Sequence, residues 1–321
     1  MNKYKVLIIG AGSIGALKDN QFDSPESNQI YTHAHACYLH PLIDLVGIMD
    51  TNVEKAYKAS VKWNTINYAT IPFTFKYKLD ETPDIVIVAT NTDTHYDIIH
   101  QLIPYKPKVI ICEKPFCTSY EQAKNIGELC EQTGIKLVVN YQREFVPELK
   151  QLSKDLKAGA YGDIYNFTLR YSRGLLREAS HAFFWCLNTF SEVEFLSKEK
   201  YYDDSPIPGD YSSWVNFNTN ICPSISFIPI GPAYSTYNAD IYTGKGRIEL
   251  LNNWKTIRFH EFTKSTYGDY KATGLLFEDK TTQLDQALTF LLDHVINIIN
   301  DKANDNWRQA LEVHKYLKLE V

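Results

Sequence analysis

The feature that most constrains this chain is an apolar run that ends in a glycine turn. Residues 5–9 read Lys-Val-Leu-Ile-Ile, and Gly10, Gly12 and Gly15 follow in the spacing Gly-x-Gly-x-x-Gly. A buried strand that enters such a turn exposes backbone N–H groups, and the missing Cβ atoms let a pyrophosphate approach the main chain closely. The residues predicted to form this dinucleotide site are Gly10, Gly12, Ser13, Ile14 and Gly15.

A second apolar run supplies the acidic residue that such a site uses. Residues 45–49 lead into Asp50, whose carboxylate would accept the ribose hydroxyls of NAD and repel the 2′-phosphate of NADP. NAD is therefore the expected cofactor, ahead of NADP. Asp50 lies 35 residues after Gly15, whereas roughly 20 are usual. We therefore place an insertion in the polar segment 18–29, either as a surface loop or as a lid over the cofactor.

Length, composition and charge narrow the remaining classes of protein. A chain of 321 residues with 44% hydrophobic residues is long enough for two domains. No apolar run is long enough to cross a bilayer and no signal-peptide pattern precedes the first strand, which predicts a cytoplasmic protein. The net charge is −5 with scattered Lys and Arg. This pattern argues against nucleic acid or an anionic membrane as a partner.

The cysteines and histidines do not predict a metal site. The six cysteines have no CxxC or other metal-ligand spacing, so we expect neither zinc nor disulfides. His33, His35 and His40 lie close together in the sequence. No set of carboxylates or cysteines completes them, and we therefore expect no metal there.

Strands and helices alternate between Asp50 and residue 143. Continuous apolar runs are typical of strands that are buried on both faces of a parallel sheet. The expected elements are helices at 53–63, 95–103 and 119–133 and strands at 84–90, 108–112 and 136–140. This rhythm predicts a doubly wound parallel sheet, a Rossmann domain over residues 1–143. Ligands lie beyond the carboxyl ends of such strands. The further site residues expected there are Thr90, Asn91, Thr92, His95, Glu113, Lys114 and Arg143.

Beyond residue 143 the pattern changes to short alternating segments with Gly, Pro and Asn turns between them. It predicts an α+β domain over residues 144–321, built on a largely antiparallel open sheet. The expected strands are 164–172, 211–218, 224–228, 239–242, 247–251 and 255–261, and the expected helices are 147–157, 178–196, 283–300 and 307–317. An apolar-aromatic open face on this sheet would form a homodimer or homotetramer. Its candidate residues are Tyr211, Trp214, Phe217 and Phe227.

Five motifs occur together in this chain: the glycine turn, residues 89–95, the tripeptide Glu113-Lys114-Pro115, residues 140–143 and a helix with Ser180-His181. In this order they resemble the glucose-fructose oxidoreductase/inositol dehydrogenase (Gfo/Idh/MocA) family. The resemblance implies NAD(P)-dependent hydride transfer at a secondary alcohol or ketone of a sugar, cyclitol or nucleotide sugar. It also implies that Glu113 holds the cofactor ribose, that Lys114 lies by the nicotinamide and substrate, and that His181 is the acid/base.

These roles agree with the chemistry of alcohol oxidation. Hydride removal requires a base for the hydroxyl proton, and histidine titrates nearest to neutral pH. Lys114 can hydrogen-bond the developing oxyanion. The residues expected to bind substrate are Arg143, Arg177, Lys114 and His181.

Arg177 departs from the family pattern, because many members place an aspartate four residues before the histidine. Either His181 works without that partner, or Arg177 binds an anionic substrate group such as a phosphate or carboxylate. Glu178 could replace the aspartate only if the segment is not regular helix.

Three functions are open at this point. The leading one is a nicotinamide-dependent sugar or nucleotide-sugar dehydrogenase. The second is an NAD-retaining glycoside hydrolase, which would release reducing sugar without net NADH. The third is a non-catalytic dinucleotide-binding protein, which would bind cofactor without turnover.

Overall fold

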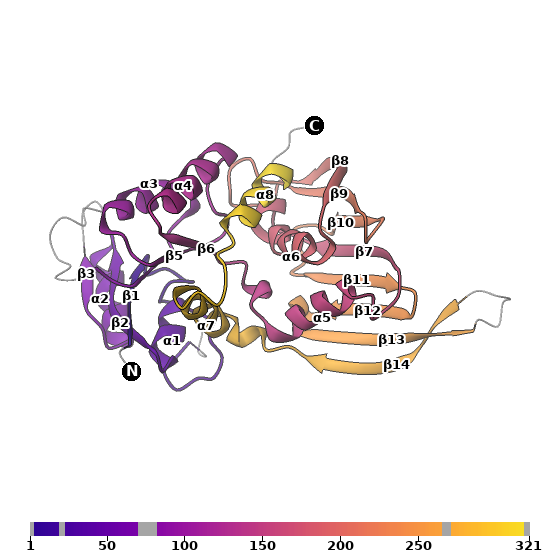
Figure 1. Cartoon of the computed structure of the whole chain (residues 1–321), viewed down its shortest axis with the longest axis horizontal. Coiled ribbons are helices and arrows are strands. Elements are labelled where there is room, and N and C mark those ends of the chain that lie inside the picture. Colours follow the sequence, from indigo (N-terminus) through magenta and orange to yellow (C-terminus); the bar gives the residue numbers. More distant parts are fainter. Residues whose placement is uncertain (1–2, 19–22, 70–81, 265–270, 318–321) are drawn as a thin grey trace. The chain divides into compact units, whose positions relative to one another are not determined.

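The chain divides into two compact units, each with its own sheet (Figure 1). The computed structural model describes residues 3–18, 23–69, 82–264 and 271–317. Unit 1 comprises Met1–Phe145 and Asp285–His314, and unit 2 comprises Val146–Leu284 and Lys315–Val321. The expectation that residues 144–321 form one domain is therefore wrong for the tail, most of which belongs to unit 1.

Unit 1 is built on a six-stranded sheet in the order β3-β2-β1-β4-β5-β6. All neighbouring strands are parallel, which confirms the predicted doubly wound sheet. The strands are β1 Tyr4–Ile9, β2 Ile43–Asp50, β3 Asn67–Ala69, β4 Ile85–Val88, β5 Val109–Cys112 and β6 Lys136–Val139. Every residue of β4 and β5 is buried. These strands have no polar face because helices cover both sides of the sheet.

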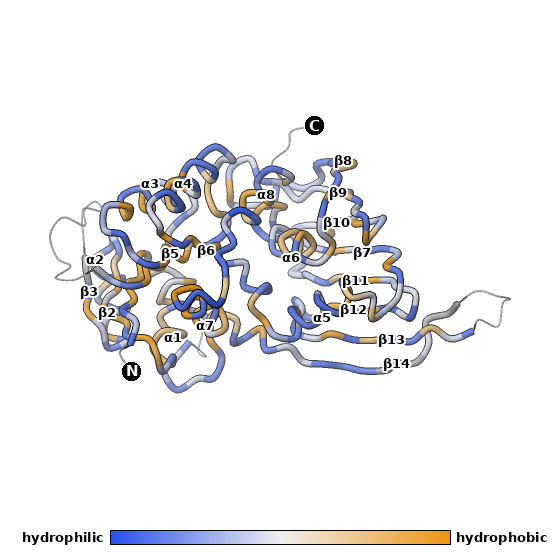
Figure 2. Tube along the Cα trace, viewed as in Figure 1, coloured by the Kyte–Doolittle hydropathy of each residue, from blue (hydrophilic) through white to orange (hydrophobic). Residues whose placement is uncertain are grey.

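The helices of unit 1 begin where the sequence supplies a cap. Thr32, Asn52 and Ser119 each accept a backbone N–H of the following turn and so start α1, α2 and α4. The helices are α1 His33–Leu39, α2 Val53–Lys62, α3 Thr92–Leu102, α4 Tyr120–Gln132, α7 Ala287–Ile299 and the first part of α8 Trp307–Leu317. Helix α7 is strongly hydrophobic (Figure 2), and its residues Leu288, Leu291 and Val295 join the core that contains Val6 and Ile8. This packing is the reason that the tail belongs to unit 1.

Unit 2 is built on an eight-stranded sheet in the order β14-β13-β12-β11-β7-β10-β9-β8. Only the pair β10–β7 is parallel, which confirms a largely antiparallel sheet. The strands are β7 Ile164–Tyr171, β8 Val193–Tyr202, β9 Ser212–Thr219, β10 Ile225–Pro229, β11 Asn238–Thr243, β12 Gly246–Leu251, β13 Thr256–Lys264 and β14 Lys271–Thr281. Strands β8 and β14 are additions to the expected set.

One face of this sheet is covered by α5 Pro147–Lys157 and α6 Ser180–Phe190 (Figure 1). The expected helix over 178–196 is wrong at both ends: a π-helical turn, Leu175–Ala179, precedes α6, and the chain enters β8 at Val193. Short 3₁₀ turns are Ile103–Tyr105, Gln142–Glu144, Asn252–Trp254 and Leu284–Gln286.

A cluster of buried aromatic residues lies between α6 and the sheet of unit 2. Phe183 of α6 contacts Phe217 and Phe227, and Trp185 contacts Phe167. Phe217 and Phe227 are 1% and 0% exposed, so the expectation that they lie on an open apolar face is wrong.

Within the described ranges, no helix combines the length and hydropathy that a membrane span requires.

Candidate functional site

In the glycine turn after β1, Gly10 and Gly15 cannot carry a side chain, because neighbouring backbone atoms occupy the space. Gly10 has φ +103°, and a Cβ added to it would lie 2.5 Å from the Ala89 carbonyl oxygen. A Cβ on Gly15 would lie 1.9 Å from the Gly10 carbonyl oxygen, which no real structure tolerates. At Gly12, by contrast, no described atom lies within 4 Å of the Cβ position. The turn is therefore tightly packed underneath and open above Gly12, as a phosphate cradle requires.

Asp50, at the end of β2, is fixed beside this turn. Its Oδ2 accepts the Ala11 N–H at 2.7 Å, and its Oδ1 accepts the Asn52 N–H at 2.7 Å. A carboxylate offers about four lone-pair sites, so one acceptor position remains on each oxygen. Two such positions on one carboxylate match the two hydroxyls of a ribose.

The insertion interrupts the helix that usually follows the glycine turn. The turn at residues 13–16 is joined to the start of α1 by two backbone hydrogen bonds: His33 N–H donates to Ile14 O and Ala34 N–H donates to Gly15 O, both at 2.9 Å. Residues 17–32 lie between these two pieces. Of the predicted insertion 18–29, residues 19–22 lie outside the described residues. Asp23 is 3% exposed, so the insertion includes a buried anchor as well as surface.

Glu113 follows β5 and is held by two donors. Its Oε1 lies 2.7 Å from His33 Nε2 and accepts the Asn140 Nδ2–H at 2.6 Å. Burial alone would raise the pKa of Glu113, but the bonds from His33 and Asn140 and the nearby Lys114 charge lower it. Glu113 is thus a buried carboxylate. Asn140 Oδ1 is also buried and has no hydrogen-bond partner in the described part of the chain. A hydroxyl of a bound ligand would satisfy it.

His95 is buried between the segments that follow β4 and β5. Its ring is 1% exposed, with Nε2 3.1 Å from Thr90 O and Nδ1 3.1 Å from Pro115 O. Burial is the main cause of the lowered pKa of His95. Both ring nitrogens thus lie against backbone carbonyl oxygens, which supports a role of His95 in holding the segment after β5; its contact with a cofactor stays a prediction. Lys114, in that segment, is partly buried.

The other predicted residues of unit 1 follow the strand ends as expected. Thr90 and Asn91 follow β4, and Thr92 begins α3; Thr94 Oγ1 donates to Thr90 Oγ1 at 2.8 Å. Arg143 follows β6 and is 7% exposed.

His35 and His40 have separate partners. His35 stacks on Trp63 with ring centroids 5.0 Å apart, and His40 Nε2 lies 3.2 Å from Asp293 Oδ1. Among the residues that the structure describes, no group of three or more His, Cys, Asp and Glu is placed to hold a metal ion. All six cysteines are buried thiols.

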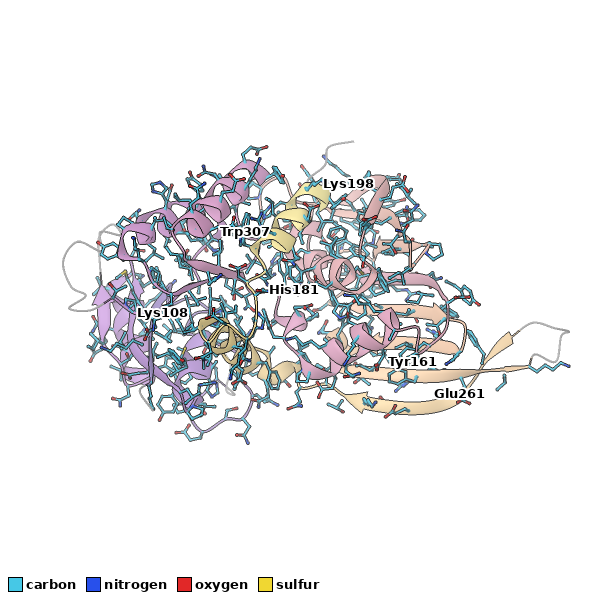
Figure 3. The ribbon with its side chains drawn as sticks, in the orientation of Figure 1. Lys108, Tyr161, His181, Lys198, Glu261 and Trp307 are labelled. Atoms are coloured by element: carbon cyan, nitrogen blue, oxygen red, sulfur yellow. The ribbon has the colours of Figure 1, made fainter. Side chains whose placement is uncertain are left out.

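Unit 2 carries His181 and Arg177. His181 lies in the first turn of α6 and is 4% exposed (Figure 3). Arg177 lies in the π-helical turn, with its Nε 3.6 Å from Glu178 Oε1. The segment is therefore not regular helix, which was the condition for Glu178 to replace the missing aspartate. π-Helical turns of this kind are frequent at functional sites.

Asp210 fixes this turn and was not recognised in the sequence. Its two oxygens accept the N–H groups of Leu176 at 2.8 Å and Arg177 at 3.1 Å. Burial raises the pKa of Asp210, and these bonds oppose the rise. Gly174 must be glycine here, because its φ is +94° and a Cβ would lie 2.2 Å from Asp210 Oδ2. A sequence shows no link between residues 174 and 210.

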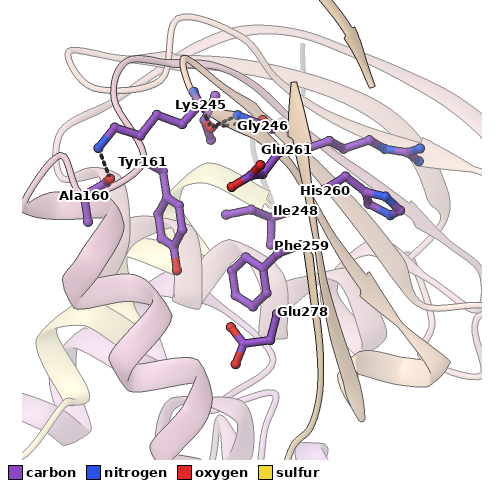
Figure 4. A pocket seen from close by; sticks show the side chains of 11 residues that line it. Ala160, Tyr161, Lys245, Gly246, Ile248, Phe259, His260, Glu261 and Glu278 are labelled. Carbon is purple, nitrogen blue, oxygen red and sulfur yellow. Dashed lines mark hydrogen bonds between the residues drawn. The ribbon is translucent and has the colours of Figure 1, made fainter. Parts of the chain in front are cut away.

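A cavity of about 230 Å³ lies in unit 2 where α5 ends over the sheet (Figure 4). Tyr161 and Phe259 stack at its wall with ring centroids 5.7 Å apart. Several of its polar groups have partners: Lys245 Nζ donates to Ala160 O at 2.7 Å, Glu278 pairs with Lys280 at 3.0 Å, and Arg247 and His260 both pair with Glu249. None of the predicted site residues lines this cavity.

Known proteins with similar sequences also have an NAD-binding Rossmann domain at the position of unit 1. Residues 4–141 match the model of the oxidoreductase family with an NAD-binding Rossmann fold, GFO_IDH_MocA. The rhizopine catabolism protein MocA of Rhizobium meliloti is 39% identical over 82 residues, which are 26% of this chain and 26% of that protein. D-Glucoside 3-dehydrogenase of Escherichia coli (strain K12) is 26% identical over 172 residues, 53% of this chain and 43% of that protein. The chain thus spans well under two thirds of these relatives.

Solved structures extend the likeness of fold over the whole chain. KijD10, a 3-ketoreductase from Actinomadura kijaniata in complex with TDP-benzene and NADP, has a TM-score of 0.74 at 14% identity, covering 98% of this chain and 96% of that one. An oxidoreductase from Agrobacterium radiobacter in complex with NAD+, L-tartaric acid and magnesium has a TM-score of 0.73 at 14% identity, covering 99% and 95%. The N-terminal domain of this chain is thus similar in sequence to the NAD-binding Rossmann domain of the Gfo/Idh/MocA oxidoreductases.

Proposed function

We propose that this protein is an NAD-dependent oxidoreductase that transfers hydride between the cofactor and a secondary alcohol or ketone of a sugar, cyclitol or nucleotide sugar. The observation that carries the proposal is the row of ligand-ready groups at the carboxyl ends of the strands of unit 1. The space at Gly12 can admit a pyrophosphate, and the Asp50 carboxylate has acceptor positions left for ribose hydroxyls. Asn140 Oδ1 is buried and can accept a hydrogen bond from a ligand. When bound, the nicotinamide supplies the hydride acceptor or donor.

Residues of the chain would accept the hydroxyl proton of the substrate and stabilise the negative charge that develops on its oxygen. We propose that His181 takes the hydroxyl proton during oxidation and that the Lys114 ammonium hydrogen-bonds the developing oxyanion. Arg143 and Arg177 would bind the substrate. A guanidinium that is about one third exposed, as that of Arg177 is, can grip a carboxylate or phosphate. The substrate is accordingly proposed to carry an anionic group.

The cofactor preference gives the first prediction. Asp50 should favour NADH over NADPH by at least about tenfold, because its carboxylate would repel the 2′-phosphate. Asp50→Ala should weaken NADH binding by about tenfold and remove the preference. Fluorescence or calorimetric titration with both cofactors measures this. Asp44→Ala, at an exposed position of the same strand, is the matched control. Tighter binding of NADPH by the wild type would contradict the role of Asp50.

The second prediction concerns assembly on the open face of the unit 2 sheet. Strand alternation puts Trp214, 41% exposed, on this face. Register places Asp240 there too, paired with Arg170 and Arg247. A large exposed aromatic residue on the same face as a cross-strand ion-pair network favours a polar homo-oligomer interface.

We therefore expect a dimer or tetramer in light scattering at micromolar concentration. Trp214→Glu should shift it toward monomer, whereas Tyr234→Glu, at a residue 61% exposed outside the strands, should not. A wild-type protein of monomer mass would refute the prediction.

A further inference from the structure

The insertion between the glycine turn and α1 is fastened by a buried polar cluster around Asp23. Asp23 Oδ2 accepts the Lys62 Nζ–H at 2.6 Å and the Lys18 N–H at 3.3 Å. Asp23 Oδ1 accepts the Thr32 hydroxyl at 3.1 Å and lies 3.6 Å from His35 Nδ1. A carboxylate that is 3% exposed is costly unless it is paired in this way. The cluster therefore fixes where the insertion ends.

The insertion ends at Thr32, which is the residue that starts α1. The Thr32 hydroxyl donates to Asp23 and accepts the His35 N–H at 3.2 Å, so one side chain both anchors the insertion and caps the helix. The next residue, His33, contacts both the glycine turn and Glu113. Its N–H donates to Ile14 O in the glycine turn, and its ring lies 2.7 Å from Glu113 Oε1.

The strand order of the unit 1 sheet indicates whether Glu113 lies toward the adenosine half or the nicotinamide half of a bound dinucleotide. The glycine turn follows β1, Asp50 ends β2 on one side of β1, and Glu113 follows β5 on the other side, beyond β4. With the pyrophosphate over the turn and the adenosine ribose on Asp50, the nicotinamide half extends toward Glu113.

We infer that the end of the insertion, from Asp23 to Thr32, is a positioning device for the nicotinamide half of the cofactor. Asp23 holds Thr32, Thr32 sets the start of α1, and His33 at that start orients the Glu113 carboxylate. The inference rests on the proposed function and assigns positioning roles to Asp23, Thr32 and His33. Asn140 alone would remain as a donor to Glu113 Oε1 if His33 moved, and a buried carboxylate with one donor fewer would change its rotamer or its protonation state.

The experiment compares two ligands that share the adenine half. NADH reaches both halves of the site, whereas ADP occupies only the adenosine and pyrophosphate positions. His33→Ala should weaken NADH binding by about tenfold, the effect of one charge-assisted hydrogen bond, and leave ADP binding within about twofold. Asp23→Asn and Thr32→Val should weaken NADH binding in the same selective way. Thr32→Ser keeps the hydroxyl and should restore it.

The control is Glu54→Gln, which removes one partner of the exposed Glu54–Lys58 pair of α2 in the same unit. Thr32→Val keeps the shape of the side chain, so it tests the inference even if Asp23→Asn does not fold. Equal loss of NADH and ADP binding would show a merely structural role and overturn the inference. Wild-type affinity for NADH in His33→Ala would also overturn it. A wild-type protein that binds ADP but no nicotinamide cofactor would instead remove the proposed function, and the inference with it.

Discussion

Lys114→Ala should lower the turnover number by about 10²–10⁴-fold once a substrate is identified, and His181→Ala should do the same. Each substitution removes a group that acts on the reacting hydroxyl, so the loss should appear in kcat. NADH affinity should survive the His181 change, because His181 belongs to unit 2 and the nucleotide-binding residues belong to unit 1. Steady-state kinetics with a panel of sugars, cyclitols and sugar acids measures these effects.

Arg177→Ala provides the contrast within the same prediction. If Arg177 binds an anionic substrate group, its loss should mainly raise KM for that substrate, with kcat nearly kept. Arg177→Lys retains the charge and should recover part of the affinity. Near-normal turnover in His181→Ala would mean that this histidine is structural. Unchanged KM in Arg177→Ala would remove the anion-binding role.

Gly15→Ala should abolish detectable NADH binding and lower the stability of the protein. The new Cβ would meet the Gly10 carbonyl oxygen at 1.9 Å, so the turn must move away from its position between β1 and β4. Overpacking of this kind costs about 1–3 kcal/mol or more. Thermal unfolding and NADH titration of the same variant report the two effects.

Gly12→Ala is the informative partner of that variant. Its Cβ would meet no described atom, so the fold should keep its wild-type Tm. The methyl group would nevertheless stand where the pyrophosphate approaches the backbone, and NADH binding should fall by at least about 100-fold. Wild-type affinity in Gly12→Ala would show that no phosphate binds over this turn.

The sheet of unit 1 could be predicted because its apolar runs are continuous and its turns carry their own chemistry. Every residue of β4 and β5 is buried, so each strand appears in the sequence as an uninterrupted apolar run. The glycine motif and Asp50 mark the ends of β1 and β2 in the sequence. The sequence does not predict strand β8, because most of its residues are at least partly exposed and its apolar positions do not alternate cleanly. The helix actually stops at Ser191, which has φ +65°.

The sequence proposes residues for the candidate site but does not predict the contacts among them. Glu113 and Lys114 stand out as a tripeptide with Pro115, but the bond between Glu113 and His33 joins residues 80 positions apart across an insertion of unusual length. His95 is of a residue type that often binds ligands, but its side chain is buried. Its contacts with the carbonyl oxygens of Thr90 and Pro115 cannot be predicted from the sequence. The apolar stripe of α7 predicts a buried face without saying which core receives it.

The return of the chain to unit 1 at Asp285 has a consequence for how the protein is made. The core around β1 includes Leu288, Leu291 and Val295, which leave the ribosome after every strand of the unit 2 sheet has been synthesised. During translation, part of the apolar surface of the unit 1 sheet therefore stays uncovered until α7 is made, whereas all strands of the unit 2 sheet are already available for folding. The same arrangement means that cutting the gene after residue 143 would not release an autonomous nucleotide-binding module, since the excised fragment would lack the helix that closes its core.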